Sequence, residues 1–227
     1  MRQGSAAWIT AFLSVLVTSP SSGQVGQSQV VGAPVAADSS TCELHVWPTN
    51  KFAVTENLGG ANYGLVGAII DELTGLKHPE DVARQFKNQL SPADQERIIR
   101  DLDLAAAYHL TGYRVVIEPA DTQPAWTLEN LRSKKRILNT NSHCYAEMAI
   151  ISQQYLKQAI GTRLRTFISY KEFGASTEST RAVLDTTATK AINFPAKTDD
   201  GVAASTASLQ NAFRENLLKF GRDKLKR

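Results

Sequence analysis

Two cysteines, each close to a histidine, are the residues of this chain whose types best suit chemistry. Cys42 lies in the stretch "TCELHVWP", and Cys144 lies about a hundred residues later in "SHCYAEMAII". A pair of thiols can form a disulfide, can bind a metal together with His45 and His143, or can stay free and reactive. Residue types alone leave these three alternatives open.

Alternation along the two segments separates the cysteines from the histidines. Successive side chains of a β-strand point to opposite faces, so Cys42 shares a face with Leu44, and Cys144 shares one with Ala146. Histidines on the other face would split four ligands across a sheet, which does not suit tetrahedral zinc. Two cysteines in an oxidising compartment tend to pair. We therefore favour a Cys42–Cys144 disulfide over a metal site or free thiols, and we predict no metal and no cofactor.

The opposite face of the same strands carries Glu43, His45 and Glu147, with Trp47 and Tyr145 beside them. Histidine titrates near neutral pH and carboxylates can tune it, so this face is the candidate site for proton transfer. A sheet face that is half solvated or covered by a helix has the same composition, and no nucleophile or lid is recognisable nearby. We therefore favour the structural interpretation of the three residues and assign no catalytic residue.

The amino terminus predicts export. Met1-Arg2 precedes an apolar run over Ala6–Val17 that is too short to span a bilayer comfortably, and small residues follow it. We predict a signal peptide over 1–23, a flexible leader over 24–41 and a single domain over 42–227, located in the periplasm or outside the cell. No later apolar segment approaches about 20 residues, so the mature protein should have no transmembrane span.

Periodicity and capping residues predict the elements that position these side chains. Alternation predicts strands, and apolar residues at three- or four-residue spacing predict helices. In chain order we expect a strand over 42–47, an apolar turn or helix over 56–75, helices over 78–90 and 91–112, a strand over 113–119, a short helix over 126–136, an antiparallel hairpin over 143–173, a strand over 186–195 and a helix from Ser205. This order favours an α/β (α+β) fold, with a mixed β-sheet and a long hairpin in the C-terminal half packed against helices.

Charge and motifs exclude several classes of protein. The formal net charge is +3, and much of it lies in the terminal stretch "KFGRDKLKR" rather than on one basic face, so we expect no nucleic-acid partner. The chain also lacks the zinc-protease, hydrolase-elbow, Walker and EF-hand motifs.

The stretches "CELHVWP", "CYAE" and "RTFISYKEFG" together resemble a group of uncharacterised exported bacterial proteins, over Cys42 to Gly174. The order of elements is also similar to that of envelope α/β domains such as the amino-terminal domain of the Tol-Pal periplasmic protein and the curli-secretion lipoprotein. Unlike the lipoprotein members, this chain has no lipidated cysteine after its signal. Neither resemblance implies a set of catalytic residues.

Export, an ordinary core and the lack of an active-site motif favour one function. We predict a non-enzymatic interaction or assembly factor of the periplasm or envelope, with an envelope protein as its partner. The alternatives are a small exported hydrolase, or a carrier of a ligand or metal, that uses the face of Glu43, His45 and Glu147. The sequence predicts no particular oligomeric state.

Overall fold

The computed structural model describes five stretches of the chain, and the regions before and between them are outside its scope. The described residues are 42–57, 79–123, 127–140, 142–158 and 161–226. The signal peptide and leader predicted over 1–41 lie outside them, as does most of the apolar segment predicted over 56–75. Those parts of the sequence analysis therefore stay predictions.

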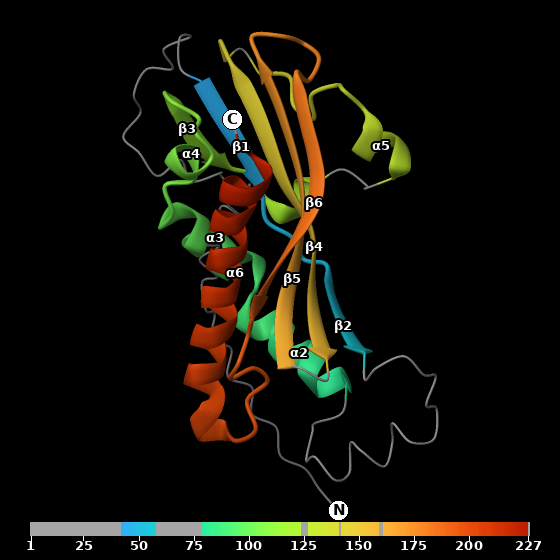
Figure 1. The fold of residues 1–227 in the computed structure, drawn as a ribbon, viewed down its shortest axis with the longest axis vertical. Coiled ribbons are helices and arrows are strands. Elements are labelled where there is room, and N and C mark those ends of the chain that lie inside the picture. The colour runs from blue at the N-terminus through green and yellow to red at the C-terminus, as the bar shows by residue number, and fades with distance from the viewer. Residues whose placement is uncertain (1–41, 58–78, 124–126, 141, 159–160, 227) are drawn as a thin grey trace, which may run out of the picture. The chain divides into compact units, whose positions relative to one another are not determined.

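The described residues form a six-stranded mixed sheet with helices packed against it, which confirms the predicted α+β class in a single domain (Figure 1). The strands are β1 (Cys42–Trp47), β2 (Phe52–Asn57), β3 (Tyr113–Ile117), β4 (Tyr145–Gln158), β5 (Gly161–Gly174) and β6 (Arg181–Lys190). The helices are α2 (Pro79–Gln89), α3 (Pro92–Arg100), α4 (Leu104–Ala107), α5 (Leu128–Arg132) and α6 (Val202–Lys224), with 3-10 turns η1 (Ala120–Thr122) and η2 (Asp199–Gly201).

The long strand β4 organises the sheet. Both β1 and β2 run parallel to it, β1 beside its first residues and β2 beside its last. On the other side of β4, the predicted hairpin is present, because β5 pairs with β4 and β6 pairs with β5, both antiparallel. The strand order is β3-β1-β4-β5-β6, with β2 also paired to β4. In this order β6 is the edge strand next to β5.

One face of the sheet holds the main hydrophobic core. Helix α6 packs on β5 and β6, and α2, α3 and α4 pack around it. The predicted apolar stripe of α6 is fully buried at Leu209, Phe213, Leu217 and Phe220, because residues at this spacing share one side of a helix. Within the described part of the chain, no helix is both long enough and apolar enough to cross a bilayer. We call this face of the sheet the helical face.

The opposite face, which we call the second face, carries α5 and the chain that follows it (Figure 1). The Lys171 side chain, on β5, donates to the carbonyl of Asn130 in α5 at 3.4 Å. The main-chain amide of Ile137 donates to the Glu147 carboxylate on β4 at 2.9 Å. These contacts hold α5 and the segment after it over Glu147 on β4 and Lys171 on β5.

Three elements differ from the expectation. Strand β2 was not predicted, and the helix expected over 91–112 is interrupted between α3 and α4. The break has a local cause, since the Asp103 side chain accepts a hydrogen bond from Ala106 N and begins a new helix. The third difference is in β6, which begins at Arg181, earlier than the expected strand over 186–195.

Candidate functional site

The two cysteines form a disulfide that joins adjacent strands. Cys42 begins β1 and Cys144 immediately precedes β4, with their Cα atoms 4.5 Å apart. The Glu43 amide donates to the Cys144 carbonyl at 3.0 Å, so the backbone is paired at the same point. The structure thus has the favoured Cys42–Cys144 pairing. His143 is exposed, whereas His45 is buried on the second face, so neither histidine forms a ligand set with the thiols.

On the second face, His45 lies between two carboxylates. Its Nδ1 is 2.7 Å from Glu118 Oε1, and its Nε2 is 3.2 Å from Glu43 Oε2. Arg114, on β3, donates from its NH2 group to Glu43 Oε1 at 2.5 Å. The result is a row of four side chains from Arg114 through Glu43 and His45 to Glu118, which we call the His45 row.

The His45 row can hold a proton, but no nucleophilic side chain among the described residues is hydrogen-bonded to His45. A neutral imidazole donates from only one nitrogen, so both contacts are hydrogen bonds only when the ring or one carboxyl carries an additional proton. Among the described residues, His45 has no hydrogen-bonded Ser, Thr or Cys that it could deprotonate as a nucleophile. His45 is also only 5% exposed, and its ring lies against Tyr145, with the ring centroids 5.1 Å apart.

Glu147 belongs to a second group of contacts. Tyr145 donates its hydroxyl proton to Glu147 Oε2 at 3.1 Å, and Lys171 Nζ lies 3.5 Å from Glu147 Oε1. The Glu147 and Lys171 side chains are 3% and 4% exposed, which makes this a buried ion pair. Arg136 extends over the Tyr145 ring, 5.0 Å from its centroid, and helps to close the site from solvent.

The environment shifts the pKa of three of these groups in directions that follow from burial and pairing. Partial burial by itself raises the pKa of Glu43, but hydrogen bonds from Arg114 and His45 outweigh it, so that pKa lies below its usual value. Deeper burial raises the pKa of Glu147, although Ile137 N–H and Lys171 oppose the shift. Burial, followed by the charge of Glu147, also raises the pKa of the Tyr145 hydroxyl.

The predicted candidate residues therefore lie on one face but in two groups. Glu43 and His45 share the His45 row, whereas the Glu147 carboxylate contacts Tyr145, Ile137 and Lys171 instead. Sequence analysis missed Glu118, Arg114 and Lys171. Alternation along β3 and β5 could have placed Arg114 and Lys171 on a polar face, but only the pairing of β3 with β1 brings Glu118 to His45.

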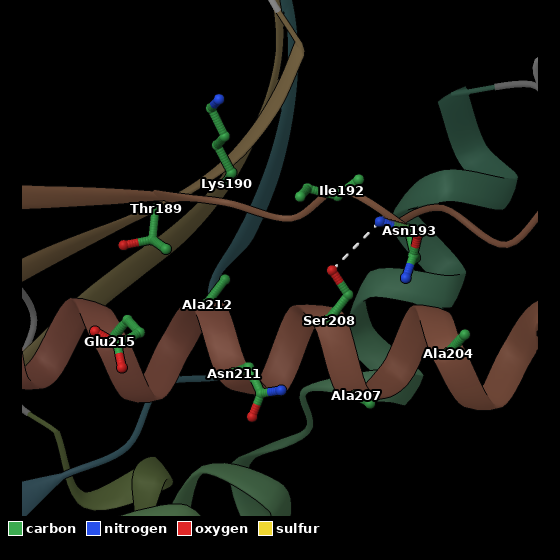
Figure 2. Close-up of a pocket in the computed structure, with 10 residues that line it drawn as sticks. All are labelled: Thr189, Lys190, Ile192, Asn193, Ala204, Ala207, Ser208, Asn211, Ala212 and Glu215. Carbon is green, nitrogen blue, oxygen red and sulfur yellow. Dashed lines mark hydrogen bonds between the residues drawn. The ribbon is translucent and has the colours of Figure 1, made fainter.

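Two open hollows lie elsewhere on the described surface. The first, about 420 Å³, is formed where the chain leaves β6 and passes α6 (Figure 2). Its lining includes Ile192, Ala207 and Asn211, and the Asn193 amide donates to the Ser208 hydroxyl across it at 3.3 Å. The second, about 450 Å³, lies at the segment from Asp103 to Tyr113. Neither hollow is lined by Glu43, His45 or Glu147.

No group of three or more His, Cys, Asp or Glu side chains among the described residues is arranged to hold a metal ion. The two nitrogens of His45 are both turned to carboxylates, so neither is directed at an empty coordination position. The arrangement instead has the contacts of a buried polar layer that joins β1, β3, β4 and β5.

Comparisons with known proteins give no family assignment. No protein-family model matches the chain, and no curated protein matches it. A crystal structure of an uncharacterized protein is similar with 10% identity and a TM-score of 0.33, over 82% of this chain and 99% of that one. A neuraminyllactose-binding hemagglutinin homolog from Helicobacter pylori is similar with 10% identity and a TM-score of 0.28, over 81% of this chain and 82% of that one. These TM-scores are too low to assign a fold or a function.

Proposed function

We propose that this chain is an exported, envelope-associated protein without catalytic activity, which binds a protein partner through β6 and α6. The observation that carries the proposal is the position of the titratable side chains. They are buried and paired with one another across the sheet, while an open hollow lies elsewhere, between the β6 exit and α6. The polar layer then has a structural role, and the hollow is the binding surface.

The disulfide supports the exported part of the proposal. Disulfides persist in oxidising compartments such as the periplasm and are rare in the cytosol. The Cys42–Cys144 bond joins the first and the central strand of the described sheet, where reduction would act on the whole fold. The signal sequence predicted over 1–23 agrees with this location.

The hollow has properties that suit a protein segment with an apolar side chain. Ile192 at its rim is 78% exposed, so its side chain is accessible to a partner. The α6 side is built from small residues, among them Ala204, Ala207 and Ser208, so a partner's backbone can approach closely (Figure 2). The occupant that we propose is therefore a short segment of another envelope protein, with an aliphatic residue that contacts Ile192.

Site-specific photo-cross-linking in the producing cells tests this proposal. A photoreactive phenylalanine analogue at Asn211, an exposed residue in the lining of the hollow, should give a discrete cross-linked protein species. The same analogue at Ala203, which is exposed on the same helix outside the hollow, should not. Equal cross-linking from both positions, or none from Asn211, would contradict the proposed surface. The substitution Ala207→Arg should remove the Asn211 cross-link without lowering the stability of the protein.

A further inference from the structure

Three basic side chains gather on the second face at the end of the hairpin, away from α5. Arg163 and Arg165 lie on the opposite face from Leu164, which is fully buried on the helical side. Lys190 is directly opposite Arg163 in the β5–β6 register. Figure 2 agrees with this placement, since the Lys190 side chain extends away from α6 while Thr189 points toward it.

Among the described residues, these charges repel one another and no carboxylate is paired with them. Directly opposed side chains in an antiparallel pair have Cβ atoms about 5 Å apart, where like charges are destabilising. Within the described part of the chain, Arg163 and Lys190 have no ion-pair partner, and Arg165 has only a 3.5 Å contact with Gln154 Oε1. Lys224 shows the contrast, because it is paired with Asp185 at 2.7 Å. Like charges placed opposite each other in a sheet are expected where a ligand supplies the opposite charge.

Large aliphatic side chains are exposed along the same strand and just after it. Leu184, on the same face of β6, is 54% exposed, and Ile192 follows Lys190 by two residues. Phe167, on β5, is on this face too and is only partly buried. Basic and exposed apolar side chains are therefore combined on one sheet surface. We call this surface the basic face and define it by Arg163, Arg165, Lys190 and Leu184, with Ile192 at its edge.

We propose that the basic face docks the protein on an anionic lipid surface, with the cations at headgroup phosphates and Leu184 and Ile192 in the interfacial layer. A bilayer satisfies both kinds of side chain at once and requires no pocket, because its headgroups can adjust to the spacing of the cations. Each basic residue near such a surface strengthens binding about fivefold, so three together contribute on the order of 100-fold. This inference is tested separately from the protein partner proposed above, but the two surfaces share Lys190 and Ile192, so a bilayer and that partner would compete for them.

Vesicle co-sedimentation tests the proposal with the purified chain in the form that the producing cells release. The protein should sediment with vesicles of equal parts phosphatidylglycerol and phosphatidylcholine, and it should stay in solution with vesicles of phosphatidylcholine alone. Added salt should weaken the binding, because exposed charges are screened. Sedimentation with both kinds of vesicle, or with neither, would overturn the proposal.

Two triple variants with equal charge change locate the surface. The basic-face variant has Arg163→Gln, Arg165→Gln and Lys190→Gln. The control variant has Arg132→Gln, Lys134→Gln and Lys135→Gln, which neutralises the exposed basic segment at the end of α5. Vesicle affinity should fall on the order of 100-fold in the first and by less than tenfold in the second. An equal loss in both would mean general charge attraction and would overturn the assignment.

One more variant and two competition experiments distinguish a bilayer from other ligands. Ile192→Ser should weaken vesicle binding several-fold, since it removes an interfacial side chain but no charge. Inorganic phosphate at millimolar concentration should not compete, because isolated ions lack the multivalency of a bilayer. Competition by free phosphate would indicate a site for a single ion instead. Binding to polyglutamate but not to anionic vesicles would indicate an acidic protein segment, and either result would overturn the lipid proposal.

Discussion

At the scale of single residues, Glu147 and Lys171 form the most deeply buried ion pair on the second face. Burial of two charges is costly, and their mutual attraction offsets that cost only while both partners are present. The Tyr145 hydroxyl and the Ile137 amide supply further hydrogen bonds to the Glu147 carboxylate. The pair therefore specifies how α5 and its following segment pack on the sheet, without adding much net stability.

The first prediction concerns this pair. Glu147→Gln should lower the free energy of unfolding by about 3–5 kcal/mol, because Lys171 would remain buried without its counter-charge. The double variant Glu147→Gln with Lys171→Met should recover most of that loss, because no buried charge is left. Urea unfolding followed by circular dichroism measures both. An equal or larger loss in the double variant would argue against the ion-pair explanation.

The second prediction concerns Gly221 in α6. A Cβ at this position would lie 2.5 Å from Tyr108 Cδ1 and 2.6 Å from the Ala107 carbonyl oxygen. Alanine normally stabilises a helix interior by about 1 kcal/mol relative to glycine. Gly221→Ala should instead destabilise the protein by about 1–3 kcal/mol, since α4 and the Tyr108 ring must move. Thermal unfolding checks the sign, and a higher melting temperature would contradict the close packing of α4 on α6.

The face of the sheet on which a side chain lies could be predicted from the sequence, because side chains alternate along a strand. The separation of Cys42 from Glu43 and His45 follows from the two-residue period, and the structure has it. The partners of His45 could not be predicted in this way, because Glu118 meets His45 only through the pairing of β1 with β3. Periodicity gives the face of a side chain but not its neighbour on the next strand.

At the scale of elements, the free edge of the sheet at β6 is protected by its own side chains. The Ala191 amide donates to Thr162 at the end of β5, so alternation directs the Thr186 amide away from β5. Asp185 Oδ1 accepts from the Thr186 amide at 2.6 Å, and Lys224 pairs with the same carboxylate. An edge strand with a capped amide is a poor template for another strand.

The third prediction follows from this cap. Asp185→Ala should expose the Thr186 amide and produce concentration-dependent dimers, detected by analytical ultracentrifugation. Asp199→Ala, which has the same charge change at an exposed turn, should leave the protein's association state unchanged.

The same cap should depend on pH. Lys224 and the Thr186 amide hold the pKa of Asp185 below its usual 3.8. The cap is therefore present above that value and is lost as pH falls through the lowered pKa. An Asp185→Ala variant that stays monomeric at all concentrations would contradict the protective role of the Asp185 cap.

Elements were predictable where caps and periodicity agree. Ser91 and Pro92 predicted the start of α3, and the structure shows a capping box between Ser91 and Asp94. Periodicity alone extends this helix to residue 112, because the apolar spacing continues past Asp103, where the side-chain cap begins a new helix. Strand β2 alternates as well, but a pattern of six residues beside a glycine-rich stretch is too short to distinguish a strand from a turn.

At the scale of the whole molecule, the disulfide closes a loop of 102 residues between β1 and β4. The fourth prediction is that Cys42→Ala with Cys144→Ala lowers the free energy of unfolding by up to about 4–5 kcal/mol, from loop-closure entropy in the unfolded chain. Urea unfolding of the variant and of the reduced parent protein should give similar midpoints. A midpoint equal to that of the oxidised protein would contradict a structural disulfide.

We have proposed that the buried polar layer has a structural role and that the β6–α6 hollow is the surface that binds a partner. The most direct measurement compares His45→Gln with Ala207→Arg for urea stability and for the Asn211 photo-cross-link, at a temperature where both are folded. We predict that His45→Gln lowers stability by about 1–3 kcal/mol, because Glu43 and Glu118 lose their shared partner, and keeps the cross-link. Ala207→Arg should keep stability and lose the cross-link. A lost cross-link in folded His45→Gln, with an unchanged one in Ala207→Arg, would contradict the account.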